Sequence, residues 1–232
     1  MPPPVTELRR ALRELHELRD FQPRVWTDPS DPAFIGVTLI ERSVALLAPR
    51  LTGTVLDVGC GQRPYARYFQ HVTRMIACDH DAKRGPVDFE CPADRVPLAD
   101  ASVDGILCTE VLEHVPDPAA VWREFHRLLR PQGKVLLTTP MYWPSHEVPY
   151  DFYRFPEHGL RYLAETAGFR VDAFVPRGGV WAFLGQVAMH AAGHYLKFRW
   201  QRRWWNRFWL RLDRARCNPG LTIGWTVLAS KP

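Results

Sequence analysis

The segment Val55-Leu56-Asp57-Val58-Gly59-Cys60-Gly61 is the most informative part of this chain. Its apolar residues are typical of a short strand buried inside a parallel sheet, which we predict over 54–58. The two glycines that follow form a turn without Cβ atoms, so the backbone can come close to a bound ligand. Asp57 stands just before this turn, where a carboxylate can meet a cationic group. The stretch therefore predicts a site for a nucleoside-bearing cofactor.

The residues after the turn narrow the choice of cofactor. Tyr65-Ala66-Arg67-Tyr68-Phe69 can begin a helix, and the free N–H groups at its start would point at the ligand. Pro64 stands where the dinucleotide pattern Gly-x-Gly-x-x-Gly has its third glycine, which disfavours NAD and FAD.

Strand and helix signals alternate along the rest of the chain, which predicts a parallel, doubly wound α/β sheet. The predicted helices cover 34–48, 117–130 and 156–167. The predicted strands cover 54–58, 73–78, 87–89, 103–108, 134–139, 169–175 and 223–229.

Two further segments complete the expected organisation. We expect an N-terminal helical cap over 1–50, which begins with an amphipathic helix containing Leu8, Leu12 and Leu15. The domain proper would cover 51–232. The connection from about 176 to 221 is far longer than a hairpin needs, so we expect a helical insertion with helices over 180–196 and 197–215.

Composition indicates an ordinary folded protein, with 46% hydrophobic and 24% charged residues. No apolar run approaches the roughly 18 residues that cross a bilayer, and the N-terminus lacks a signal-peptide pattern. Five cysteines without a CxxC motif favour a reduced, cytoplasmic setting. His190 and His194 have the i,i+4 spacing of a metal pair, but no third ligand stands nearby, so we expect no metal.

A second acidic position supports the cofactor site. Asp79 ends the second predicted strand about 20 residues after the glycine turn, where a carboxylate can accept hydrogen bonds from both ribose hydroxyls. His80 is placed to lie against a purine ring. A helix-capping aspartate is the alternative interpretation of Asp79.

Together these features resemble the class I S-adenosylmethionine-dependent methyltransferases, from about residue 52 to 140. The resemblance implies a Rossmann-like, mostly parallel seven-stranded sheet with helices on both faces and an antiparallel last strand. It also implies S-adenosylmethionine as cofactor and S-adenosylhomocysteine as product. Residues 94–104, 108–115 and 128–133 resemble the family's later motifs. The cofactor-binding positions that the resemblance implies are Asp57, Gly59, Cys60, Gly61, Asp79, His80, Ala93, Asp94, Thr109 and Glu110.

The acceptor side is predicted in the loop after the fifth strand, from Tyr142 to Phe155. Ligands of doubly wound sheets bind beyond the carboxyl ends of the strands, where this loop would lie. His146 is the predicted general base, because the ordinary pKa of histidine lies near neutrality. A loop whose Asp151–Arg154 pair only caps the next helix is the alternative. The residues predicted to orient His146 or the acceptor are Tyr150, Asp151, Tyr153 and Arg154.

The net charge of +5 is concentrated in one segment, because residues 197–216 hold eight Lys or Arg and a single acid, Asp213. Mixed arginine and tryptophan at helical spacing is compatible with three interpretations. The segment can dock on the domain or on a second subunit, lie on an anionic membrane surface, or bind nucleic acid. Nucleic acid is the least favoured of the three, since no RNA-recognition module accompanies the segment.

The sequence thus predicts an enzyme that methylates a small organic acceptor, on oxygen of a glycan, lipid-linked or natural-product substrate. It would be cytoplasmic, with peripheral contact at the inner membrane surface as a further option. One alternative is an RNA or protein methyltransferase that holds a polymer with the basic insertion. The other is a non-catalytic scaffold that retains the fold.

Overall fold

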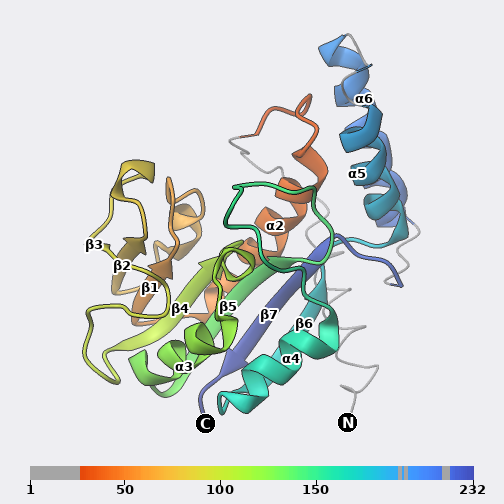
Figure 1. The fold of residues 1–232 in the computed structure, drawn as a ribbon. Coiled ribbons are helices and arrows are strands. Elements are labelled where there is room, and N and C mark those ends of the chain that lie inside the picture. The colour runs from red at the N-terminus through yellow and green to blue at the C-terminus, as the bar shows by residue number, and fades with distance from the viewer. Residues whose placement is uncertain (1–26, 193–194, 196–197, 216–219) are drawn as a thin grey trace.

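The computed structural model describes residues 27–192, 195, 198–215 and 220–232, and these build one seven-stranded sheet (Figure 1). The strand order is β3-β2-β1-β4-β5-β7-β6. The predicted N-terminal helix around Leu8 lies outside the described residues. The strands are β1 (Thr54–Val58), β2 (Arg74–Asp79), β3 (Phe89–Glu90), β4 (Val103–Thr109), β5 (Leu129–Pro140), β6 (Arg170–Pro176) and β7 (Gly224–Ser230).

Strand β1 lies in the middle of the sheet, parallel to β2 on one side and to β4 on the other. At its last position, Val58 pairs with Cys78 and with Cys108. The chain reverses its direction of winding between β1 and β4, and ligands of such sheets bind at this point. Strand β7 runs antiparallel between β5 and β6. The predicted Rossmann-like fold is therefore confirmed.

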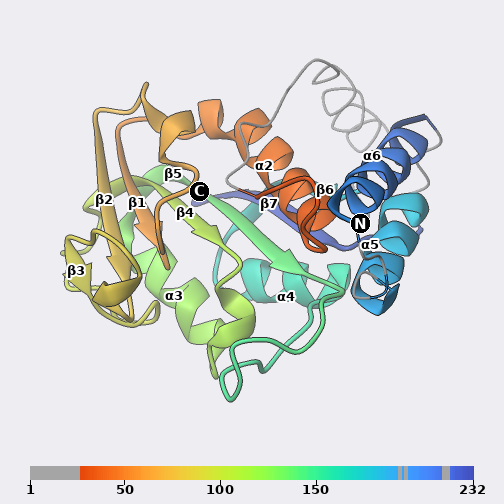
Figure 2. The same cartoon turned by 90° about the horizontal axis from the view of Figure 1, so that it is seen from above.

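Helices cover both faces of the sheet (Figure 2). Helix α2 (Phe34–Leu47) packs on one face, where Ile40 and Val44 join Val55 and Leu107 in one buried cluster. Helices α3 (Pro118–Leu128) and α4 (Glu157–Thr166) cover the other face around the fully buried Trp122. The described part of the predicted N-terminal cap thus shares a hydrophobic core with the central strands.

The helix predicted to begin at Tyr65 is wrong in type and length. The chain forms only a short 3-10 helix, η3 (Ala66–Phe69). One turn is sufficient to bury Tyr65 and Phe69 in the cluster beneath α2, and the chain then leads directly into β2. A four-residue helix has too few aligned peptide units to supply the N-terminal dipole expected there.

The predicted insertion between β6 and β7 forms helices α5 (Val180–Ala192) and α6 (Arg199–Ala215). In Figure 1 this pair stands at one end of the sheet and projects beyond it. The Asp213 carboxylate of α6 accepts hydrogen bonds from the backbone N–H groups of Gly179 and Ala182, both at 3.0 Å, at the start of α5. Within the described ranges, no helix combines the length and the apolar character needed to cross a bilayer.

Candidate active site

A cavity of about 600 Å³ opens at the carboxyl ends of β1 and β4, where the winding reverses. The glycine turn forms one side of it, and α2 and the loop after β5 form the other. Its lining residues are Gly36, Val37, Ile40, Gly59, Cys60, Gly61, Gln62, Pro64, Tyr65, Arg67, Thr109, Glu110, His114, Trp143, His146, Glu147, Arg177 and Ile223.

The glycine turn has the geometry that its sequence predicts. Gly59 and Gly61 both have positive φ, +64° and +48°, a conformation that residues with a side chain rarely adopt. A Cβ atom on Gly59 would lie 2.2 Å from a methyl group of Val111. A Cβ on Gly61 would meet no atom within 4 Å, so this glycine leaves open space beside the backbone. The turn therefore presents bare peptide groups to the cavity.

Two buried carboxylates stand behind this turn. Asp79 accepts hydrogen bonds from the Gly61 N–H at 3.0 Å and from the Asp81 N–H at 3.1 Å. Asp57 is almost completely buried, and burial raises its pKa to about 7, against a smaller opposing effect of Arg63. A cation bound beside Asp57 would favour its ionised form.

Glu110 is held at the cavity by a partner that sequence reasoning missed. Its carboxylate pairs with the guanidinium of Arg177, with 2.9 Å between Nη1 and Oε1, and accepts the Thr138 hydroxyl at 2.8 Å. The Arg177 side chain is 2% exposed, and its Nη2 also donates to the Thr139 carbonyl at 2.6 Å. The sequence offered a single indication of this pair, namely that Arg177 closely follows the predicted strand 169–175. The pair fixes one wall of the cavity.

A second ion pair spans two loops beside the cavity. Arg84 follows β2 and donates two hydrogen bonds, at 3.0 and 2.8 Å, to the two carboxylate oxygens of Glu147 in the loop after β5. Gln62, in the glycine turn, donates to the Arg84 carbonyl. The loops that follow β1, β2 and β5 are thereby joined at one side of the site.

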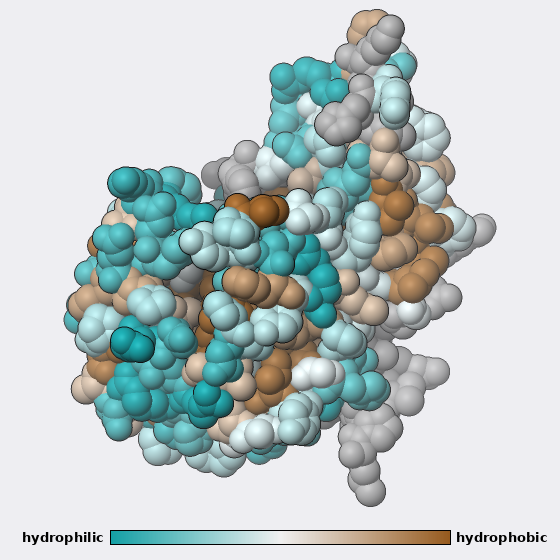
Figure 3. Space-filling model, viewed as in Figure 1, coloured by the Kyte–Doolittle hydropathy of each residue, from teal (hydrophilic) through white to brown (hydrophobic). Residues whose placement is uncertain are grey.

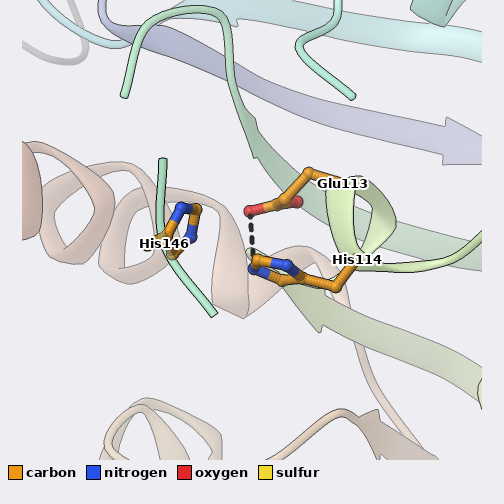
Figure 4. Close-up of side chains that lie close together, drawn as sticks. All are labelled: Glu113, His114 and His146. Carbon is orange, nitrogen blue, oxygen red and sulfur yellow. Dashed lines mark ion pairs between the residues drawn. The ribbon is translucent and has the colours of Figure 1, made fainter. Parts of the chain in front are cut away.

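The acceptor side of the cavity brings His146 next to His114, with ring centroids 4.6 Å apart in an edge-to-face arrangement (Figure 4). Burial and His114 lower the pKa of His146, so its ring is neutral at physiological pH. Trp143 forms a neighbouring wall. A Cβ on Gly36 would lie 2.6 Å from the Trp143 ring, and this ring also meets His190 of α5 edge-to-face.

The four residues predicted to orient His146 or the acceptor do not line the cavity. Asp151 accepts the backbone N–H of His146 at 3.1 Å and is held by Arg154, whose Nη1 lies 2.6 Å from Oδ1. The Tyr150 carbonyl lies 2.8 Å from Nδ1 of His114, and the Tyr153 hydroxyl donates to Pro116 at 2.8 Å. These residues shape the loop that carries His146 and contact no cavity space themselves.

The predicted cofactor positions fall into three groups according to where they lie relative to the cavity. Gly59, Cys60, Gly61, Thr109 and Glu110 line the cavity, whereas Asp57 and Asp79 lie buried behind it. Three others, His80, Ala93 and Asp94, lie outside the lining. His80 has 60% of its side chain exposed, and Ala93 is buried in the core cluster around β4. Their predicted contacts with the cofactor stay predictions.

A family model described as a methyltransferase domain matches residues 33–173, which includes the glycine turn, both carboxylates and the loop with His146. The chain belongs to this methyltransferase family. The predicted membership is confirmed, and with it S-adenosylmethionine as the cofactor of the family. The residues fit such a cofactor, because the site combines an uncovered Gly61, a buried carboxylate for a cation and a cavity of nucleoside size.

Relatives support the assignment over part of the chain. A curated relative from Xylella fastidiosa, the ubiquinone biosynthesis O-methyltransferase, is 35% identical over 136 residues, which cover 49% of this chain and 54% of the relative. The chain thus spans about half the length of the curated relative that it matches.

Two solved structures share the fold. The Burkholderia thailandensis 1,6-didemethyltoxoflavin-N1-methyltransferase, solved with 1,6-didemethyltoxoflavin and S-adenosylhomocysteine, has a TM-score of 0.57 at 18% identity and covers 100% of this chain and 93% of its own. The cyclase SpnF has a TM-score of 0.59 at 17% identity and covers 98% of this chain and 95% of its own.

The buried Asp57 predicts that cofactor affinity depends on pH. Its raised pKa of about 7 means that the carboxyl is mostly protonated at pH 6, whereas a bound ammonium or sulfonium group favours the carboxylate. Binding then requires loss of a proton, so affinity for S-adenosylmethionine should fall about tenfold from pH 7.5 to pH 6. Calorimetric titration at the two pH values measures this change.

The Asp57→Asn variant removes the ionising group and should bind weakly with little dependence on pH over this range. Asp100→Asn changes an exposed carboxylate that is distant from Asp57 in the sequence. This control variant should show the same pH dependence of cofactor affinity as the parent protein. An unchanged pH dependence in Asp57→Asn would assign the proton to another group.

Glu113, His114 and His146 each bring one potential ligand atom to within 4.8 Å of the others (Figure 4). The sequence predicts no metal, and at this cluster that expectation stays a prediction. Burial and Glu110 raise the pKa of Glu113 well above its ordinary value. Glu113 Oε1 lies 3.8 Å from Nε2 of His114, too far for a hydrogen bond.

We therefore expect the melting temperature of the purified protein to be unchanged by EDTA and by added Mg²⁺ or Mn²⁺. Thermal unfolding followed by circular dichroism tests this. A melting temperature that falls on chelation and recovers with one of these ions, but not in Glu113→Gln, would establish a metal at this cluster.

Proposed function

We propose that this chain transfers the methyl group of S-adenosylmethionine to oxygen of a small organic acceptor, of glycan, lipid-linked or natural-product type. The cavity carries the proposal, because it is lined at one side by the glycine turn and at the other by His146, His114 and Trp143. The Xylella fastidiosa relative, an O-methyltransferase in name, favours oxygen over nitrogen or carbon.

The cofactor, when bound, supplies a methyl group on a sulfonium whose leaving group is a neutral thioether. Such a reaction depends mainly on alignment of the acceptor and on exclusion of water. In this chain Trp143, Ile40 and Val37 give the acceptor side apolar walls, and the Glu110–Arg177 pair keeps that side of the cavity in place. Residues around the cavity therefore act chiefly by positioning.

His146 is the proposed proton acceptor for a hydroxyl of the substrate. Its lowered pKa keeps the ring neutral, and a neutral ring nitrogen can take a proton. Asp151 and Arg154 act as positioning residues, since they hold the His146 backbone and the loop around it. Nδ1 of His146 lies 3.2 Å from the Pro144 carbonyl, a contact that would favour Nε2 as the atom for the substrate proton.

The polymer-modifying alternative has less support. The described residues of α6, which carry the basic charge of the insertion, do not line the cavity. The scaffold alternative rests on the general point that a fold alone does not fix the reaction, since a cyclase also shares this fold. Cofactor binding separates the scaffold alternative from both methyltransferase alternatives.

The first test is a calorimetric titration with S-adenosylhomocysteine. The proposal expects a saturable heat in the parent, and weaker binding in Asp79→Ala, because that variant releases the Gly61 turn. No heat in the parent would leave only the scaffold interpretation.

The second test measures release of S-adenosylhomocysteine with a panel of phenolic, glycan and isoprenoid-linked hydroxyl acceptors. His146→Ala should lower turnover by about a hundredfold or more, the range of a lost general base, with unchanged cofactor affinity. His158→Ala, on the exposed face of α4, is the matched control and should turn over like the parent. Turnover in His146→Ala equal to that of the parent would exclude His146 as the base.

A further inference from the structure

Helix α6 has one face that is packed against the domain. Asn206 is fully buried and donates hydrogen bonds to the carbonyls of Pro29 and Asp31, both at 2.9 Å. Leu210 joins a small core with Phe34 and Ala182, and Asp213 caps the start of α5. These contacts fix the orientation of the helix, so the opposite face is held outward.

The outward face carries a row of exposed aromatic side chains. Trp200, Trp204 and Phe208 recur at every fourth position and are 66%, 55% and 38% exposed. Trp204 and Phe208 stack on each other, with ring centroids 5.4 Å apart and planes within 7°. Large aromatic groups are rarely left in water in a row, and such a patch marks an interaction surface.

A row of arginines runs beside the aromatic row. Arg203, Arg207 and Arg211 follow the same four-residue spacing, and together the two rows line one shallow groove of about 450 Å³. Arg203 lies 3.3 Å from the Asp28 carboxylate, whereas Arg207 and Arg211 are exposed and have no ion-pair partner among the described residues. The single acid of α6, Asp213, is buried on the inner face. The outer face of α6 therefore carries arginines and no acid of its own, and Asp28 pairs with Arg199 and Arg203 at its start.

From this face we infer that α6 docks on an anionic phospholipid surface. Indole rings prefer the boundary between headgroups and acyl chains, and arginines beside them can pair with lipid phosphates. Figure 3 shows apolar surface on the same helical pair, over α5, where Leu184 is 41% exposed. The helix lies on the surface and does not cross it, in agreement with its length and charge.

Two other occupants fit less well. A second copy of this chain would bring its own arginine row to the contact, with no exposed acid of α6 to pair with it, and interface cores are depleted of charge. A nucleic acid would need free aromatic faces for its bases, whereas Trp204 and Phe208 already cover one face of each other. An anionic bilayer offers an interface for the aromatic row and phosphates for the arginine row at the same time.

The test is co-sedimentation of the full chain with vesicles of phosphatidylcholine alone and of an equimolar mixture with phosphatidylglycerol. We expect binding to the anionic vesicles only, and loss of binding at high salt. Each arginine removed lowers the partition coefficient about fivefold, so Arg207→Ala/Arg211→Ala should bind about 25-fold more weakly. Trp204→Ala should also bind more weakly at unchanged charge.

The matched control is Arg123→Ala/Arg170→Ala, which removes two exposed arginines far from α6 and should bind like the parent. Circular dichroism verifies that each variant is folded. Absence of binding to the anionic vesicles, equal loss in the control, tighter binding to single-stranded RNA than to vesicles, or a dimer that Trp204→Ala dissociates would each overturn the inference. The assay uses neither cofactor nor acceptor, so its result is independent of the proposed reaction.

Discussion

The hydrogen bond from the Gly61 N–H to the buried Asp79 carboxylate is the constraint on which the site depends. It joins the turn after β1 to the end of β2, so the two parts of the predicted cofactor site cannot move apart independently. A carboxylate removed from water must be satisfied by donors, and here backbone N–H groups of two loops supply them. Burial likewise raises the pKa of Asp57, which stands two residues before Gly59, to about 7. Two buried carboxylates, Asp57 and Asp79, therefore lie directly behind the glycine turn.

The acceptor side is assembled from parts that are distant in sequence. Trp143 packs against Gly36 of α2 and His190 of α5, and Arg177 from the end of β6 fixes Glu110 after β4. None of these contacts involves the glycine turn, and of these residues only Glu110 is also a predicted cofactor position. Variation of α2, the β5 loop and the insertion can therefore change the acceptor while the glycine turn remains the same, as expected for a fold that serves many substrates.

Helix α6 carries a second surface, which is not part of the cavity. Its inner face is fixed by hydrogen bonds from Asn206 and to Asp213, and its outer face carries the aromatic and arginine rows. The cavity and this surface lie on one chain, and a methyltransferase held at a lipid surface would meet lipid-linked acceptors at high local concentration. The inferred membrane contact and the proposed acceptor class are thus compatible, although each is tested separately.

The order of strands and helices, the glycine turn and the helical insertion could be predicted from the sequence, because hydrophobic periodicity and glycine chemistry are local properties. Gly59, Gly61 and His146 line one cavity, with Asp57 buried behind it, while their roles stay predictions. The prediction failed at residues 65–69, where the helical pattern yields a single 3-10 turn because the chain must enter β2 at once. The sequence could not predict the Glu110–Arg177 pair, the contact of His114 with His146 or the residues of α2 that line the cavity. Those contacts join residues from separate elements, and their distances depend on how the whole sheet is packed.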